Sequence, residues 1–230
     1  MDAKRPTVVL ACKVFKSLFE RFVQEGTIQS FTYLDYGLHD FPKKLKGAVQ
    51  EALDGLPEPS LVILGYGLCG NGLDGIRAGE HSLLICRADD CIAVFLGSHE
   101  RYVKEFTAVP GTYYLTEGWL ESGSNPLQEY KKYVEKYGAA KAGWLIDQLY
   151  HNYERLALVA HSPEGLDVFR ARAQEVGRFC ERWGMRYEEI LGSTDFFERL
   201  IEAASNAERP SDDFIYVAPG GELRQDQFRR

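Results

Sequence analysis

The sequence predicts an α/β protein with two Rossmann-like parallel-sheet lobes that face each other across a cleft. Short apolar runs alternate with segments of helical periodicity, which is typical of parallel sheets covered by helices. The 230 residues are enough for two small lobes. A linker-like segment, Ser122–Pro126, separates two such series. We therefore predict an N-terminal lobe at 1–122, which carries glycine and cysteine turns, and a C-terminal lobe at 123–230.

Apolar and β-branched runs predict five strands in the first lobe, and helical spacing predicts the segments between them. The strands are expected at 7–11, 31–36, 61–64, 83–87 and 112–116. Helices are expected from Val14 towards a stop at Gly26, from Pro42 to Leu53 and around 102–106, and Ile92–Leu96 is either helical or extended. In a flavodoxin-like order, 2-1-3-4-5, the first, third and fourth strands are neighbours.

The second lobe is expected to begin with a long helical segment, 127–153, interrupted at Gly138. Three strands follow at 156–160, 187–191 and 214–217, with helices at 163–183 and 195–204. Because the strands of the two lobes come in a similar layout, and Gly220-Gly221 corresponds to the Gly65 turn, we consider an internal duplication as a hypothesis.

Composition argues against several classes of partner. The formal net charge is −7 and the Lys and Arg residues are scattered among acids, so no nucleic-acid or anionic-membrane surface is expected. No apolar run approaches the roughly 20 residues that span a bilayer. Residues 1–6 lead straight into a strand and lack a signal-peptide pattern. We therefore expect a cytoplasmic protein.

Five cysteines without an export signal are interpreted as reduced thiols. Cys180 lies on the apolar stripe of a predicted helix and Cys86 lies inside a predicted strand, so both are expected to pack in the core. Cys12, Cys69 and Cys91 each follow the end of a predicted strand, and those strands are the expected neighbours. Adjacent strands lie about 4.8 Å apart, so inward-folded turns would bring the three sulfurs together.

A glycine-rich turn surrounds the second of these cysteines, with four glycines among the eight residues 65–72. Glycine permits a positive φ and lets the backbone approach a ligand closely. Open α/β sheets place their binding sites at such strand ends. We expect a bound cofactor to contact Gly67, Gly70, Asn71, Gly97 and Ser98.

Three thiolates suit zinc or an iron–sulfur cluster better than magnesium or calcium. We expect Cys12, Cys69 and Cys91 to bind the metal. His161 is the expected fourth ligand if the lobes face each other, with His39 and His99 as alternatives. Asp89 and Asp90 are expected either to support the site or to cap the next helix.

Two other classes of function remain open, and the sequence does not decide whether the protein is an enzyme. Cys69 is a candidate nucleophile for a small substrate, since backbone N–H groups and a following helix would lower its pKa, and Asp90 is a candidate catalytic partner. The third class is a small-molecule-binding accessory protein with purely structural cysteines. The sequence contains neither GxGxxG in register nor a P-loop, so nucleotide binding is not supported.

Several segments resemble the domain-of-unknown-function family numbered 1638. The most specific are Gly-Tyr-Gly-Leu-Cys-Gly at 65–70 and Asp-Asp-Cys-Ile at 89–92, with further matches at 11–12, 34–39, 96–98 and 111–119. The resemblance implies an α/β protein of anaerobic bacteria and archaea, often encoded near corrinoid-dependent methyltransferases. It also implies that Cys12, Cys69 and Cys91 are the motif cysteines. Corrinoid or redox metabolism, and corrinoid or methyltransferase partners, are expectations from the resemblance alone.

Overall fold

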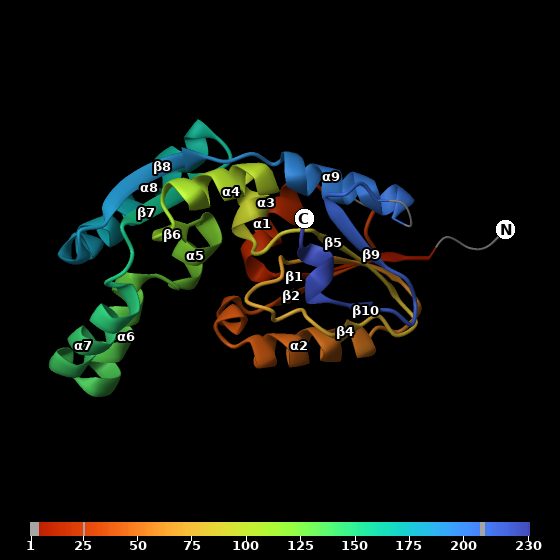
Figure 1. The fold of residues 1–230 in the computed structure, drawn as a ribbon, viewed down its shortest axis with the longest axis horizontal. Helices are drawn as coiled ribbons and strands as arrows, with labels where there is room; N and C mark the ends of the chain where they lie inside the picture. Colours follow the sequence, from red (N-terminus) through yellow and green to blue (C-terminus); the bar gives the residue numbers. More distant parts are fainter. Residues whose placement is uncertain (1–4, 25, 208–209) are drawn as a thin grey trace. The chain divides into compact units, whose positions relative to one another are not determined.

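A computed structural model describes residues 5–24, 26–207 and 210–230 (Figure 1). The predicted α/β class is confirmed, since helices alternate with parallel strands. The chain forms two compact units, one made of the residues up to 99 together with those from 194, the other of residues 100–193. This division differs from the predicted ranges 1–122 and 123–230. Residues 1–4, part of the segment in which we looked for a signal peptide, lie outside the described residues.

The first unit contains a five-stranded sheet of order β2-β1-β3-β5-β9. Four of its strands are parallel: Ser30–Leu34 (β2), Thr7–Cys12 (β1), Leu61–Gly65 (β3) and Ser82–Cys86 (β5). These pairings are the predicted ones. The fifth strand is Phe214–Val217 (β9), antiparallel to β5, and replaces the predicted 112–116. Apolar runs indicate strands but not which sheet edge they join, and an antiparallel edge strand is common on parallel sheets.

Helices cover both faces of this sheet (Figure 1). On one face, Leu45, Val49 and Leu53 of α2 (Pro42–Asp54) pack against even-numbered β1 residues and their equivalents on β3. On the other, the ring of Phe19 in α1 (Lys16–Phe22) meets the ring of Phe197 in α9 (Asp195–Ala203) at 4.8 Å. Because side chains alternate along a strand, Cys12 lies on the α2 side of β1.

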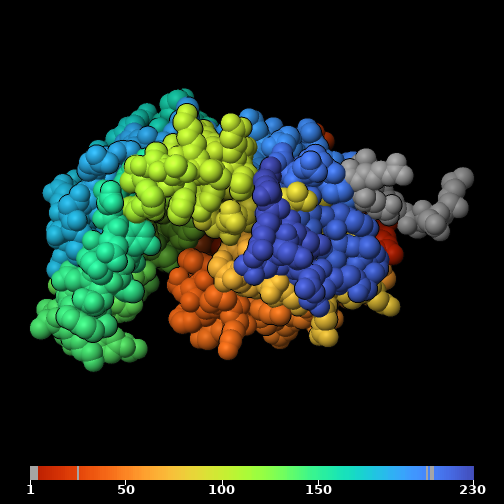
Figure 2. All heavy atoms as spheres, in the orientation of Figure 1, coloured from red at the N-terminus to blue at the C-terminus, as the bar shows by residue number. Residues whose placement is uncertain are grey.

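The C-terminal segment lies on the first unit (Figures 1 and 2, dark blue). Its short strand Glu222–Leu223 (β10) pairs antiparallel with Ile76–Arg77 (β4), and the Gln225 N–H donates to Asp74 Oδ1 at 2.8 Å. Phe228 is buried in the α2-side core. This ribbon was not predicted from the sequence, because strands of two residues are too short to show a periodic pattern.

The second unit contains a three-stranded parallel sheet of order β6-β7-β8. Its elements are Thr112–Leu115 (β6), Glu117–Ser122 (α5), Pro126–Tyr137 (α6), Ala139–Tyr150 (α7), Arg155–Ala160 (β7), Pro163–Cys180 (α8) and Arg186–Leu191 (β8). The predicted interruption at Gly138 is confirmed, since its φ of 80° ends α6. Residues 214–217 belong to the first unit, so the three-strand layout of the duplication hypothesis does not hold.

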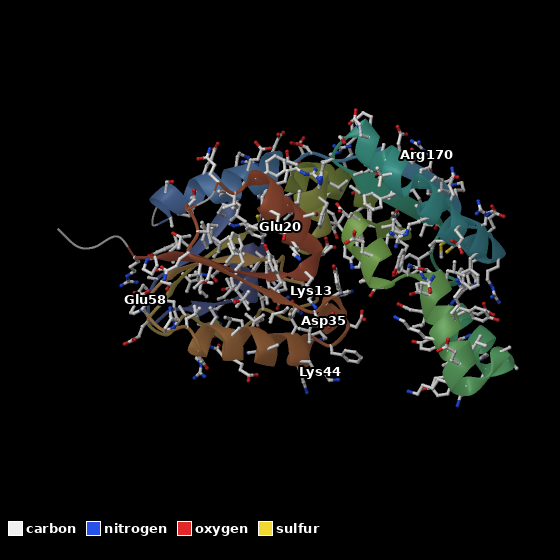
Figure 3. All side chains as sticks on the ribbon, turned by 180° about the vertical axis from the view of Figure 1, so that it is seen from behind. Lys13, Glu20, Asp35, Lys44, Glu58 and Arg170 are labelled. Atoms are coloured by element: carbon white, nitrogen blue, oxygen red, sulfur yellow. The ribbon has the colours of Figure 1, made fainter. Side chains whose placement is uncertain are left out.

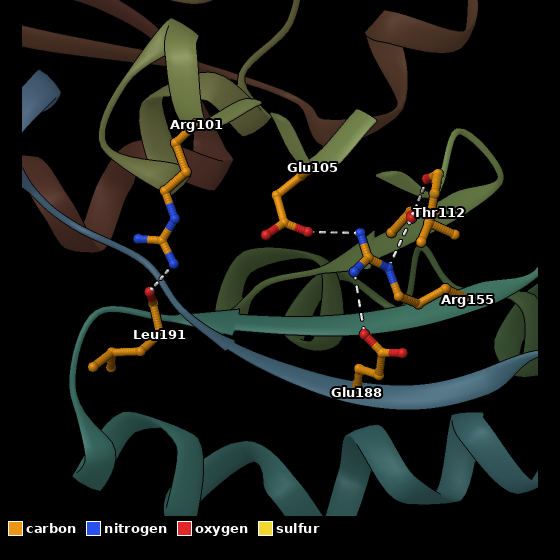
Figure 4. A network of polar contacts seen from close by, with 7 residues as sticks. Arg101, Glu105, Thr112, Arg155, Glu188 and Leu191 are labelled. Carbon is orange, nitrogen blue, oxygen red and sulfur yellow. Dashed lines mark hydrogen bonds and ion pairs between the residues drawn. The ribbon is translucent and has the colours of Figure 1, made fainter. Parts of the chain in front are cut away.

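An ion-pair network centred on the buried Arg155 joins the three strands of the second unit to a helix (Figure 4). Arg155, only 5% exposed, donates to Glu105 Oε2 at 2.8 Å, to Glu188 Oε2 at 3.1 Å and to Thr112 Oγ1 at 2.9 Å. It thereby links β7 to β6, β8 and α4 (His99–Ala108), a helix whose first residue belongs to the first unit. Because Arg155 and Thr112 begin their strands, the network lies at the amino end of the sheet, opposite the edge where α/β sheets place ligand sites.

No helix within the described ranges is long and apolar enough to cross a bilayer.

Candidate functional site

Three cysteines lie at the carboxyl edge of the first sheet. Cys12 is the last residue of β1, Cys69 follows β3, and Cys91 follows β5 and directly precedes α3 (Ile92–Leu96). Since β1, β3 and β5 are adjacent and parallel, their carboxyl ends lie at the same edge. All three residues are half-buried, whereas Cys86 and Cys180 are buried as expected.

Backbone hydrogen bonds hold the loop of Cys69 against the loop of Cys91. The Leu68 N–H donates to the Ala88 carbonyl at 2.9 Å, and the Cys69 N–H donates to the Asp89 carbonyl at 3.0 Å. A Cβ at Gly67 would lie 2.5 Å from the carbonyl carbon of Asp90, so only glycine fits there without a shift. Gly67 therefore allows the two loops to approach each other.

The turn around Cys69 has an uncommon backbone. Cys69, Gly70 and Asn71 are consecutive residues with positive φ, of 50°, 61° and 67°. Asparagine tolerates this region, whereas for cysteine it is uncommon. The Gly72 N–H closes the turn on the Cys69 carbonyl at 3.0 Å. The described chain continues from here through turns into β4, so the helix that we expected after this turn is absent.

Burial is the main cause of a raised pKa at each of the three thiols. It raises the pKa of Cys12 to about 11 and that of Cys69 to about 12. The pKa of Cys91 is raised well above its ordinary value by burial, and then by the charges of Cys69, Asp90 and Cys12. Asp90 and Cys12 likewise raise the pKa of Cys69. The three side chains are thus within electrostatic reach of one another.

Two charged residues lie beside Cys12, one of each sign. Asp35 raises and Lys13 lowers the pKa of the Cys12 thiol, after the effects of burial and of a backbone hydrogen bond. Figure 3 shows Lys13 and Asp35 at the same end of the first unit. The Asp35 carboxylate also accepts the Tyr36 N–H at 2.7 Å, which begins a 3₁₀ turn at Tyr36–Asp40.

The two aspartates beside Cys91 have different contacts. Asp90 Oδ1 accepts the Ile92 N–H at 2.8 Å, so Asp90 caps the start of α3 while its charge acts on Cys69 and Cys91. Asp89 Oδ2 lies 3.5 Å from His99 Nε2. The other histidine alternative, His39, lies 3.2 Å from an Asp40 carboxylate oxygen.

The remaining predicted site residues lie in loops that follow strands or helices. Gly70 lies near Pro42, with 3.9 Å between a built Cβ and Pro42 Cγ. Gly97, at φ 95°, ends α3, and Ser98 follows it. His161 directly follows β7 in the second unit, so its role as a ligand beside these thiols stays a prediction. The cofactor contacts expected of Gly67, Gly70, Asn71, Gly97 and Ser98 also stay predictions.

Tyr66 is a residue of this site that the sequence analysis did not identify. It directly follows β3, is 4% exposed, and belongs to the core against which Cys12 and Cys69 pack. Its hydroxyl is buried and makes no hydrogen bond to any residue that the structure describes. Burial, followed by the charges of Cys12 and Cys69, raises the pKa of this hydroxyl. In the sequence, its place in the segment 65–70 next to Cys69 is the only signal, and an ordinary core aromatic would have looked the same.

Fold and site together define an α/β protein with three thiols gathered from three neighbouring strand ends. Among the described residues, no three or more His, Cys, Asp and Glu side chains are arranged, as they stand, to hold a metal ion.

The chain belongs to the DUF1638 family, whose members are described as proteins of unknown function. The model of this family matches residues 33–201. The matched range includes Tyr66, Cys69 and Cys91, and Cys12 precedes it. No curated protein and no solved structure matches the chain.

Proposed function

We propose that the protein binds zinc or an iron–sulfur cluster through the thiolates of Cys12, Cys69 and Cys91. The observation that carries this proposal is the convergence of three half-buried cysteines from the ends of β1, β3 and β5. The hydrogen bonds between the loops of Cys69 and Cys91 support it further, since they fix the two loops relative to each other.

The donor set fits a soft metal. Sulfur ligands select zinc and iron–sulfur clusters over hard cations. When the three cysteines are protonated, no positive charge draws their sulfurs together. Metal binding is coupled to deprotonation of the thiols, so a bound cation would attract three thiolates. A fourth position would accept His161 or a small molecule, and its chemistry there would be that of a Lewis acid or a redox centre.

The rival function, a nucleophilic Cys69, has less support. A nucleophilic thiol needs a lowered pKa, whereas burial raises the pKa of Cys69 to about 12. The helix whose amino end was expected to lower that pKa is absent from the described turn. The third candidate, an accessory protein with purely structural cysteines, does not account for the meeting of three of the five cysteines at one sheet edge.

The setting of the proposed function rests on expectations from the sequence. We place it in the cytoplasm. The resemblance to the family suggests that the bound group serves corrinoid-dependent one-carbon or redox metabolism, with a small molecule or a corrinoid or methyltransferase protein as the partner.

The test is the metal and sulfide content of protein purified without oxygen. We expect about one zinc, or one iron–sulfur cluster, per wild-type chain. Cys12→Ala, Cys69→Ala and Cys91→Ala should each lower metal affinity by more than about 100-fold, since even the loss of an outer-shell partner costs 10–100-fold. Cys180→Ala is the matched control, because it removes a buried thiol from the second unit and should leave the metal content unchanged.

Two results would contradict the proposal. One is wild-type protein that holds no metal and takes up none on anaerobic reconstitution. The other is a metal content that falls as much in Cys180→Ala as in the three site variants. Selective labelling of Cys69 by a thiol probe in metal-free native protein would instead favour the nucleophile.

A further inference from the structure

The Tyr66 hydroxyl is a buried polar group without a partner beside the thiols. Tyr66 directly follows β3 and lies on the α2 side of the sheet, together with Leu64 and Leu68. Cys12 and Cys69 pack against the same core from the carboxyl edge. With 4% of the residue exposed, the hydroxyl cannot turn to bulk water. An apolar core surrounds the ring, so the ring alone explains an aromatic residue here, but not the hydroxyl.

Phenylalanine would serve the packing better. An unpaired buried hydroxyl costs about 1–3 kcal/mol in desolvation, which a phenylalanine of nearly the same shape avoids. Other tyrosines of the unit keep their hydroxyls paired or exposed, and Tyr216, for example, lies 3.1 Å from Ser82 Oγ. A partner for Tyr66 that comes with a bound group would offset this cost.

We propose that the Tyr66 hydroxyl donates a hydrogen bond to an anionic acceptor atom bound to the metal. This inference rests on the proposed function. The acceptor is either a sulfide of an iron–sulfur cluster or the non-protein ligand of a single metal ion. Tyr66 is thus a positioning residue for the bound group and not a ligand of the metal.

The surroundings of Tyr66 favour an anionic acceptor. Cys12 and Cys69 pack against the same core as Tyr66, so the residue lies on their side of the site. A phenolic hydroxyl donates its proton to an acceptor, and hydrogen bonds to ionised acceptors are roughly twice as strong as those to neutral ones. Hydrogen bonds to the sulfurs of a cluster, and to ligands of a metal, tune potential and affinity.

The experiment compares wild-type protein with Tyr66→Phe and Tyr216→Phe. The second variant is the control, since it removes a hydroxyl that already has a partner in the same unit. If the purified protein holds iron and sulfide, the reduction potential is measured by redox titration. If it holds a single metal, cobalt(II) is substituted and azide is titrated, with the visible spectrum as the signal. The thermal stability of each metal-free protein is measured in parallel.

We expect Tyr66→Phe to retain the metal and to be at least as stable as wild type when metal-free. Its reduction potential should become more negative, or its azide dissociation constant should rise about tenfold or more, as for the loss of a hydrogen bond to a charged group. Tyr216→Phe should change neither property and should lose stability.

Other outcomes overturn the inference. These are unchanged potential and azide affinity in Tyr66→Phe, failure of the wild-type cobalt protein to bind azide, loss of metal from Tyr66→Phe, and destabilisation of its metal-free form. Absence of metal from the wild type would instead contradict the proposed function itself, so the two failures are distinguishable.

Discussion

At the scale of single residues, protonation sets the behaviour of Cys12, Cys69 and Cys91. Burial removes the water that would stabilise a thiolate, and neighbouring negative groups add repulsion, so each thiol keeps its proton at neutral pH. A metal must displace these protons to bind. Metal affinity should therefore rise with pH, and the three thiols of the metal-free protein should react slowly with alkylating reagents at neutral pH.

The rate of alkylation by iodoacetamide tests these thiols directly. Because only the thiolate reacts and the pKa values of Cys12 and Cys69 are raised to about 11 and about 12, both should react more slowly than free cysteine at neutral pH. For each unit by which the pKa is raised, the thiolate fraction falls about tenfold. The rates should keep rising with pH beyond the ordinary value of 9.0. Labelling can be followed residue by residue with peptide mass spectrometry.

A rate for Cys69 that levels off near pH 9.0, the ordinary value, would contradict the raised pKa. Rapid labelling of Cys69 at neutral pH would do the same and would favour its role as a nucleophile.

At the scale of elements, the site depends on how two loops meet. In the sequence, the glycines of 65–72 suggested close approach to a ligand, whereas in the structure Gly67 is required by the contact with Asp90. Gly72 is similarly confined, since a built Cβ would lie 2.7 Å from Leu45 Cδ2 of α2. Packing therefore accounts for both glycines: the Cys69 loop packs against the Cys91 loop at Gly67 and against α2 at Gly72.

Gly67→Ala should separate the two loops. The added methyl group overlaps backbone atoms of Asp90, which cannot move aside as a side chain would, so we expect a loss of about 1–3 kcal/mol in the free energy of unfolding. Metal content should fall with it, because Cys69 and Cys91 lie on the separated loops. Chemical denaturation and elemental analysis measure the two effects.

Gly47→Ala is the matched control for this change. Gly47 lies inside α2 with open space around it, so alanine there should stabilise the protein by up to about 1 kcal/mol and leave the metal unaffected. A Gly67→Ala protein with wild-type stability and metal content would show that the loop contact is unimportant.

The strand ends that carry the cysteines could be predicted from the sequence, whereas two contacts of the site could not. The strands that end at Cys12 and precede Cys69 and Cys91 are local apolar runs, so their ends could be placed from the sequence, as could α2 after Pro42. The isolation of the Tyr66 hydroxyl and the contact of Gly67 with Asp90 arise from residues distant in the chain. No local pattern encodes such contacts.

At the scale of the whole molecule, the last 37 residues complete the unit that begins the chain. In helix α9, Phe197 packs on Phe19 of α1 and Phe196 packs on Phe214 of β9. Strand β9 covers the edge of β5. The linker-like composition at 122–126 suggested a different boundary, because composition reports local chain character and not which sheet a later strand joins. The thiol site thus depends on residues beyond 194.

Phe197→Ala tests this assignment. The side chain is 1% exposed and its ring contacts Phe19, so its removal should cost about 3–5 kcal/mol. Hydrogen exchange measured by mass spectrometry should show faster exchange in β1 and β3, and unchanged exchange in β7 of the second unit. Val168→Ala, at a site 68% exposed on α8, should change stability by less than about 0.5 kcal/mol. Faster exchange confined to β7 would show that α9 stabilises the second unit and would contradict its assignment to the first.

X-ray absorption at the metal edge of anaerobically purified protein shows whether Cys12, Cys69 and Cys91 bind one metal centre. For zinc, we expect three sulfur ligands at about 2.3 Å, with one fewer in Cys69→Ala. For an iron–sulfur cluster, we expect cysteine sulfur and sulfide around each iron. A metal shell of nitrogen and oxygen alone, or a sulfur shell unchanged by Cys69→Ala, would contradict a shared metal centre.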